Sequence, residues 1–135
     1  MLDNHKVQAI AFKRGDRRLL RTLQSEALLR GQHFLYADCG KAHTKWQILD
    51  KVARSFGFPE QFGDNFDVLL DCLTIRLAAA GEQQGFFVVL DRLHAATHLE
   101  HELQEVLLTV FLDAGDFWMD LGVPFRIYYS TIDTL

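Results

Sequence analysis

The run FFVVLD at residues 86–91 indicates the fold of the chain more clearly than any other stretch. Its five apolar residues are too few for a helix, and phenylalanine and valine favour extended backbone. Because no polar residue alternates with them, both faces of such a strand have to be covered, which is typical of a strand inside a parallel sheet. We therefore expect the flanking sequence to supply further strands and the helices that cover them.

Amphipathic segments lie on both sides of this strand. Thr44 offers an N-cap for the first helix, which ends before Gly57 and Pro59. Strands separated by helices run parallel and are joined by right-handed crossovers, so we predict an α/β domain with a small parallel sheet. The predicted helices cover 45–56, 64 or 65 to about 79, and about 98–121, and the other strands cover 34–39 and 125–130.

A basic segment, residues 1–32, precedes this domain, which we place at residues 33–135. Its pattern predicts a short strand from Val7 to Phe12, a turn at Gly15 and an amphipathic helix. Residues 1–31 have a net charge of +4, whereas the rest of the chain has −8. This extension can enlarge the sheet, shield acidic residues of the free protein, or contact the acidic rim of a partner.

Composition narrows the class of protein. A chain of 135 residues with 49% hydrophobic and 24% charged residues is an ordinary globular domain, and its net charge of −4 argues against a general nucleic-acid binder. Cys39 and Cys72 are too few for a disulfide scaffold, and we find no secretory signal and no apolar run of membrane-spanning length. We expect a cytoplasmic protein.

Catalytic motifs are missing from the sequence. It contains no G-x-S-x-G nucleophile elbow and no glycine-rich phosphate-binding loop, so we expect a protein that is not an enzyme. The best candidates for metal ligands are His94, His98 and His101, which lie near Glu102 and Glu105. We place His94 in the loop before the helix and interpret the three histidines as solvated surface residues, with a metal site as the alternative. No cofactor is expected.

The second predicted helix begins in an acidic run. On a helix that starts near Asp64, the carboxylates of Asp64, Asp67 and Asp71 fall at i, i+3 and i+7 and share one face. Capping and the helix dipole account for the first two but not for Asp71, which lies beyond the first turn.

Another acidic stretch lies between Arg92 and Arg126. If the two helices lie side by side, their acids can merge into one patch that attracts a cationic cleft. Paired carboxylates of a glycosidase are the catalytic alternative.

The segment FPEQFGDNFDVLLDCL at 58–73 closely resembles the signature of the barstar family of intracellular ribonuclease inhibitors. The shared pattern is a hydrophobic residue with Pro-Glu, an aromatic residue with Gly, an acid and Asn, then Asp and, four residues later, Asp-Cys-Leu. A weaker resemblance extends from about Phe34 to Ser130 in β-α-α-β-α-β order. It implies a three-stranded parallel sheet packed with helices, to which the N-terminal strand and helix are an addition.

The resemblance also implies a function. Members of this family block a secreted bacterial ribonuclease of the barnase type before export, and their acidic side chains take the place of RNA phosphates in its cationic active site. By motif position, Asp71 is then the main phosphate mimic and Asp67 a second acidic contact. Gly63 and Asn65 belong to the inserted loop, and Asp113 stands where the family has a glutamate contact.

Three positions depart from the family pattern, since Gln61, Leu70 and Arg76 stand where the better-known inhibitor has aromatic contacts. The resemblance implies a basic extracellular-type ribonuclease or related toxin as the partner of a monomer in a one-to-one complex. We expect no direct contact with nucleic acid or membrane. The alternative is an interaction module of the same fold with a partner that is not a ribonuclease. The predicted partner-binding residues are Gln61, Gly63, Asp64, Asn65, Asp67, Leu70, Asp71, Arg76 and Asp113.

Overall fold

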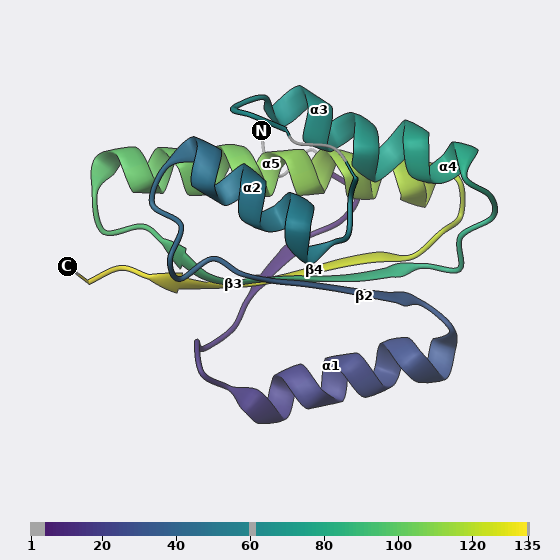
Figure 1. The fold of residues 1–135 in the computed structure, drawn as a ribbon. Coiled ribbons are helices and arrows are strands. Elements are labelled where there is room, and N and C mark those ends of the chain that lie inside the picture. Colours follow the sequence, from purple (N-terminus) through teal and green to yellow (C-terminus); the bar gives the residue numbers. More distant parts are fainter. Residues whose placement is uncertain (1–4, 60–61, 135) are drawn as a thin grey trace.

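Four parallel strands form the central sheet, in the order β1-β4-β3-β2 (Figure 1). The computed structural model describes residues 5–59 and 62–134. The predicted strands are confirmed in β2 (His33–Asp38), β3 (Phe86–His94) and β4 (Phe125–Ile132). The sheet has one strand more than the three expected, because β1 (Ala9–Ala11) of the N-terminal extension pairs with β4. The extension thus occupies an edge that would otherwise expose the backbone of β4.

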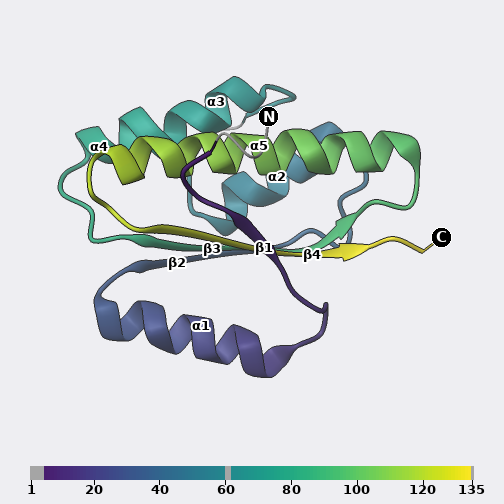
Figure 2. The same ribbon diagram turned by 180° about the vertical axis from the view of Figure 1, so that it is seen from behind.

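Helices cover both faces of the sheet (Figures 1 and 2). On one face lie α2 (Lys45–Ser55), a helical segment over 66–79, and α5 (His98–Asp120). On the other face lies α1 (Arg17–Arg30), which connects β1 to β2 at the opposite edge. The connection from β1 to β2 crosses the sheet in the opposite direction to the connections from β2 to β3 and from β3 to β4. A right-handed crossover in that direction places its helix on the opposite face of the sheet, which is where α1 lies. Within the described part of the chain, no helix combines the length and apolar character needed to cross a membrane.

The two sides of β3 explain the apolar run from which the fold was predicted. Phe86, Val88 and Leu90 belong to the larger core beneath α2 and α5 and are fully buried. Phe87 and Val89 point the other way and form a second core with α1. Both cores share one strand, so the extension and the rest of the chain fold as a single domain.

The helical segment 66–79 contains a feature that the sequence did not predict. It consists of α3 (Phe66–Asp71), a π-helical turn η2 (Cys72–Arg76) and the short α4 (Leu77–Ala79). The indole Nε1 of Trp118 on α5 donates to the carbonyl of Leu73 at 2.7 Å, within the π-helical turn. A side-chain donor inserted at a backbone carbonyl is a common cause of such a distortion, and π-helical turns are frequent at functional sites.

Candidate protein-binding site

The loop before α3 has a fixed geometry that determines where the helix begins. Gly63 has a φ of +61°, a left-handed conformation that disfavours other residues. Asn65 is the N-cap, and its side chain accepts the backbone N–H of Asp67 at 2.9 Å. Asp64 therefore precedes the cap, which corrects the prediction that it lies on the helix with Asp67 and Asp71. The side chain of Phe62, 3% exposed, anchors the loop in the core.

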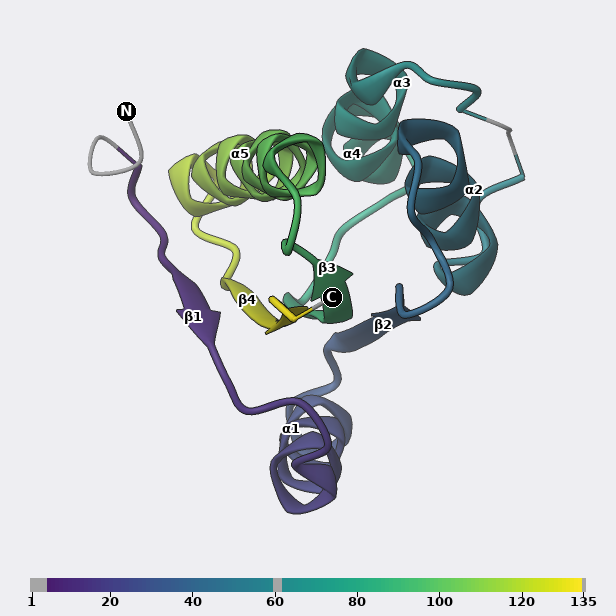
Figure 3. The same cartoon turned by 90° about the vertical axis from the view of Figure 1, so that its left-hand side faces the viewer.

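The acids of this segment are exposed to solvent. The side chains of Asp64, Asp67 and Asp71 are all exposed, and none forms a hydrogen bond or ion pair with a described residue. The ammonium group of Lys45 lies over the ring of Phe66, 5.2 Å from the ring centroid. Figures 1 and 3 show α3 on the outer side of the helical layer, away from the sheet. These carboxylates are therefore available to a cationic partner.

The inner side of α3, opposite these acids, packs against the core and α5. Leu69 and Leu73 are fully buried, and α3 and the π-helical turn both pack against α5. The Trp118 hydrogen bond fixes the π-helical turn directly after Asp71. A rigid base of this kind lowers the entropy that is lost when a partner binds.

The three positions that depart from the family pattern have different environments. Leu70 is partly buried and packs against the core, whereas Arg76 is exposed. Gln61 lies outside the described residues. Sequence reasoning missed Ile75, which is 63% exposed and lies one turn after Asp71. The available signal was its spacing, because Ile75 does not continue the i, i+4 row of Leu69 and Leu73 that is buried in the core.

The structure gives Asp113 a different environment from the acids of α3. His5 Nε2 lies 2.7 Å from its carboxylate, and the backbone N–H of Lys6 donates to Asp116 at 2.6 Å. Lys6 also forms an ion pair with Asp120. The N-terminal segment lies along the side of α5 that is turned away from α3 (Figure 3). Asp113, Asp116 and Asp120 of the second acidic stretch therefore contact the N-terminal segment, and the merging of the two stretches into one patch stays a prediction.

The histidines also differ from their predicted arrangement. His94 is the last residue of β3, not part of a loop, and its ring stacks on that of His43 with the centroids 4.0 Å apart. His98 and His101 instead contact Glu102 and Glu105 along α5, with Nε2–carboxylate distances of 3.0 and 3.1 Å. One group of possible metal ligands among the described residues unites His43, His94 and Glu100, and another unites His5, Asp113 and Asp116.

Comparison with known proteins identifies the family. The family described as Barstar (barnase inhibitor) matches residues 32–130, which begin directly before β2 and end within β4. Curated proteins and solved structures give no significant match. The match covers the segment that forms the acidic helix and most of the sheet, whereas β1 and α1 lie outside it. The chain belongs to the barstar family.

Proposed function

We propose that this protein is a non-enzymatic inhibitor of a basic ribonuclease of the barnase type or a related toxin. The loop at Gly63 and the outer face of α3 are the surface that enters the cationic active site of the enzyme. The observation that supports this most directly is that Asp67 and Asp71 pair with no described residue, on a helix whose other face is buried. Family membership supports the same conclusion.

The proposed mechanism follows from the chemistry of carboxylates. A carboxylate accepts two parallel hydrogen bonds from a guanidinium group and so resembles a phosphate to an arginine-rich site. Asp67 and Asp71 are four residues apart on α3 and present their charges on one face. Their mutual repulsion in the free protein is relieved when cations of the enzyme approach. The long-range attraction accelerates encounter and weakens as salt is added.

Asp113 is a weaker candidate for the same interface. In the free protein its carboxylate is already paired with His5, so an enzyme has to displace that contact before it gains a new one. Its side chain is nevertheless 47% exposed and remains accessible to a cation. We expect the loss of Asp113 to weaken inhibition less than the loss of Asp71.

An inhibitor that blocks a secreted ribonuclease before its export has to act in the cytoplasm. We propose that this protein acts there as a monomer in a one-to-one complex. Both cysteines are free and buried, and burial raises the pKa of the Cys39 thiol to about 12. Burial likewise raises the pKa of the thiol of Cys72, the first residue of the π-helical turn after α3. Thiols in this state are protonated at neutral pH and react slowly.

The decisive experiment is an RNA-cleavage assay in which a barnase-type ribonuclease is titrated with the wild type, Asp71→Ala and Asp133→Ala. The last variant removes the same charge from an exposed site near the C-terminus. We expect stoichiometric inhibition by the wild type and by Asp133→Ala. Asp71→Ala should bind roughly 10–150-fold more weakly, the range for a lost hydrogen bond to a charged group. Equal inhibition by all three proteins would refute the role of Asp71.

The alternative function is an interaction module with a partner that is not a ribonuclease. The apolar side chain of Ile75 on the acidic face, together with Leu70 and Arg76 in place of aromatic contacts, favours a partner surface different from that of barnase. If no ribonuclease of this type is inhibited, a partner that binds the wild type but not Asp71→Ala would support this alternative.

A further inference from the structure

Two histidines and a glutamate from three separate segments lie together at one end of the sheet. His43 belongs to the loop between β2 and α2, His94 is the last residue of β3, and Glu100 lies in the first turn of α5. Each offers one ligand atom, and the three atoms lie within 4.8 Å of one another. Figure 1 shows the end of β3 and the starts of α2 and α5 at the same end of the molecule. The topology therefore brings together side chains that no local motif connects.

The spacing of two of these groups matches the geometry of a tetrahedral metal ion. His43 Nδ1 lies 3.4 Å from Glu100 Oε2, which exceeds the usual limit of about 3.2 Å for an N–H···O hydrogen bond. Two ligand atoms that each lie about 2.1 Å from one ion, at the tetrahedral angle, are separated by about 3.4 Å. Binding of an ion by both groups therefore requires little movement of either side chain.

A hydrogen bond fixes the tautomer of the second histidine. His94 Nε2 lies 2.7 Å from the carbonyl oxygen of Gly40. A carbonyl oxygen only accepts hydrogen bonds, so Nε2 carries the proton and the lone pair of the neutral ring lies on Nδ1. Histidines that bind metal ions donate their other ring N–H to a carbonyl or carboxylate in the same way, which orients the ring and makes it a better ligand.

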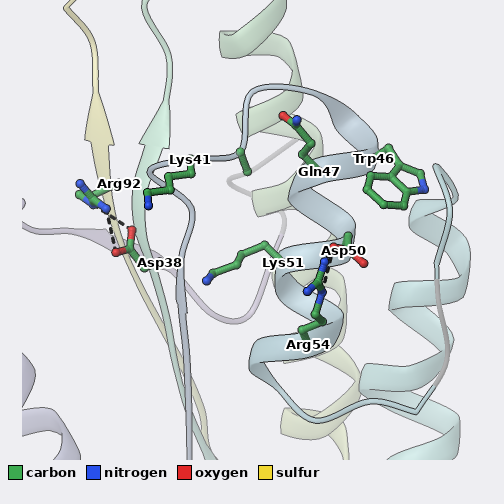
Figure 4. Close-up of a pocket in the computed structure, with 9 residues that line it drawn as sticks. Asp38, Lys41, Trp46, Gln47, Asp50, Lys51, Arg54 and Arg92 are labelled. Carbon is green, nitrogen blue, oxygen red and sulfur yellow. Dashed lines mark hydrogen bonds and ion pairs between the residues drawn. The ribbon is translucent and has the colours of Figure 1, made fainter.

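The loop around Gly40 fixes the carbonyl that orients His94. Gly40 donates its N–H to the carboxylate of Asp38 at 3.0 Å, and Arg92 donates to the same carboxylate from Nε and Nη2, each at 2.8 Å. Figure 4 shows the pair of Asp38 and Arg92 at the β2 end of the loop. A Cβ atom at position 40 would overlap with the guanidinium of Arg92, so a larger residue there would disturb this arrangement.

Glu100 has one carboxylate oxygen for the helix and one for an ion. Its Oε1 accepts the backbone N–H of Thr97 at 3.2 Å, as part of the capping box of α5, and its Oε2 faces His43. The hydrogen bond from Thr97 is the main cause that lowers the pKa of Glu100, so the carboxylate is ionised at neutral pH. The side chain is only 16% exposed, which limits its alternative orientations.

The start of α2 holds the backbone of His43. Gln47 Oε1 accepts the N–H of His43 at 2.9 Å and that of Thr44 at 3.2 Å. Figure 4 shows Gln47 at the end of the loop that leads into α2. The ring of His43 stacks on that of His94, with the centroids 4.0 Å apart. Protonation of both rings would place two like charges together, so this contact favours the neutral imidazole that binds metal ions.

A second group of possible ligands is less suited to the same ion. It consists of His5, Asp113 and Asp116 and thus offers one imidazole instead of two. The backbone N–H of Lys6 also donates to Asp116 at 2.6 Å, so one of its oxygens is already used. Zn²⁺ favours nitrogen and sulfur ligands over a site made chiefly of carboxylates.

We propose that His43, His94 and Glu100 bind one divalent transition-metal ion of the Zn²⁺ type. Imidazole nitrogen and carboxylate oxygen are both common ligands of Zn²⁺, and three protein ligands leave a fourth position for water. The ion connects the end of β3 with the segments that begin α2 and α5, so it stabilises the folded chain. None of the three residues belongs to the predicted partner-binding residues, so the proposal is independent of the inhibitor function.

Zinc binding by the full-length chain without a histidine tag tests the proposal. The protein is treated with a chelator, which is then removed, and is titrated with Zn²⁺ in competition with a chromophoric chelator. We expect saturable binding of one ion per chain and a midpoint of thermal unfolding that rises with the Zn²⁺ concentration. Co²⁺ in place of Zn²⁺ should give the visible absorption of a tetrahedral site. The proposal is overturned if neither ion binds saturably.

Matched variants identify the ligands. His43→Gln and His94→Gln should each weaken Zn²⁺ binding more than about 100-fold, the upper limit for the loss of a group that only orients a ligand. His43 is exposed, so its variant should fold, and glutamine at position 94 keeps a donor for the carbonyl of Gly40. Unchanged affinity in either variant would overturn the site.

Two controls separate this site from other histidines on the surface. His101 is 54% exposed, against 56% for His43, and it also contacts a glutamate, so His101→Gln removes a similar imidazole from outside the site. His5→Gln removes the imidazole of the second group. Both variants should retain the affinity of the wild type. Weakening by either control equal to that of His43→Gln would indicate unspecific binding and contradict the proposal.

Discussion

The packing of α1 on β3 predicts that a helix outside the family match is required for stability. Leu23 is 5% exposed and packs with Ala27 against Phe87 and Val89. Leu23→Ala removes three carbon atoms from this second core and leaves a cavity that the rigid sheet cannot fill. Buried leucine-to-alanine changes cost about 2–5 kcal/mol, and a small core beside one helix belongs in the lower half of that range. We therefore expect a loss of about 2–3 kcal/mol.

The same helix offers a matched control. Leu28 is 81% exposed, so Leu28→Ala removes the same atoms without leaving a cavity, and its effect should stay within about 0.5 kcal/mol. Urea unfolding of both variants and the wild type, followed by circular dichroism, measures the difference.

Both variants should unfold in one transition with an unchanged slope, because the two cores share β3. Equal unfolding midpoints for Leu23→Ala and Leu28→Ala would show that α1 does not pack on the sheet in solution. A separate early transition would show that the extension folds as an independent unit.

Three further predictions concern the rest of the fold. The guanidinium of Arg92 holds the pKa of Asp38 below its ordinary value, so this pair stabilises the fold above about pH 4 and its contribution disappears as the pH falls through the lowered pKa. Asp38→Asn should therefore lower the free energy of unfolding at neutral pH but not near pH 2, in urea titrations at both values. Trp118→Phe removes the donor to the Leu73 carbonyl and should cost about 1–3 kcal/mol in the same assay; an unchanged stability would contradict the importance of this bond. Asn65→Ala removes the N-cap of α3 and should cost about 1 kcal/mol, whereas Asn65→Asp should retain most of it.

The sequence predicted the elements of the fold well because their signals are local. The N-cap at Thr44 and the apolar run at 86–91 each depend on a few neighbouring residues, and both are present in the structure, where Thr44 also forms a capping box with Gln47. The fourth strand was harder to place. Whether a three-residue strand pairs with β4 depends on a partner more than a hundred residues away, and its own pattern does not specify that partner.

The candidate site could be predicted only in part for the same reason. The acidic residues of α3 were found because one short segment contains them. The π-helical turn depends on Trp118, which lies 45 residues beyond Leu73, and the pairing of Asp113 depends on His5, 108 residues before it. A groove between the carboxyl end of β2 and α2 was missed because its cations, on Lys41, Lys51, Arg54 and Arg92, come from three separate segments, none of which has a recognisable motif.

The N-terminal segment also changes how charge is distributed over the two acidic helices. Lys6 forms an ion pair with Asp120 and donates its backbone N–H to Asp116, and His5 contacts Asp113, so part of the acidic charge of α5 is balanced within the molecule. The acids of α3 have no such partners among the described residues. A cationic enzyme that approaches the helical layer is therefore attracted more strongly to α3 than to α5.

Substituting Lys6 with glutamine should leave α3 intact but spread the negative potential over both helices. We expect faster association at low salt, with little change in the dissociation rate. Stopped-flow binding at two salt concentrations would measure this, and a change confined to dissociation would contradict the argument.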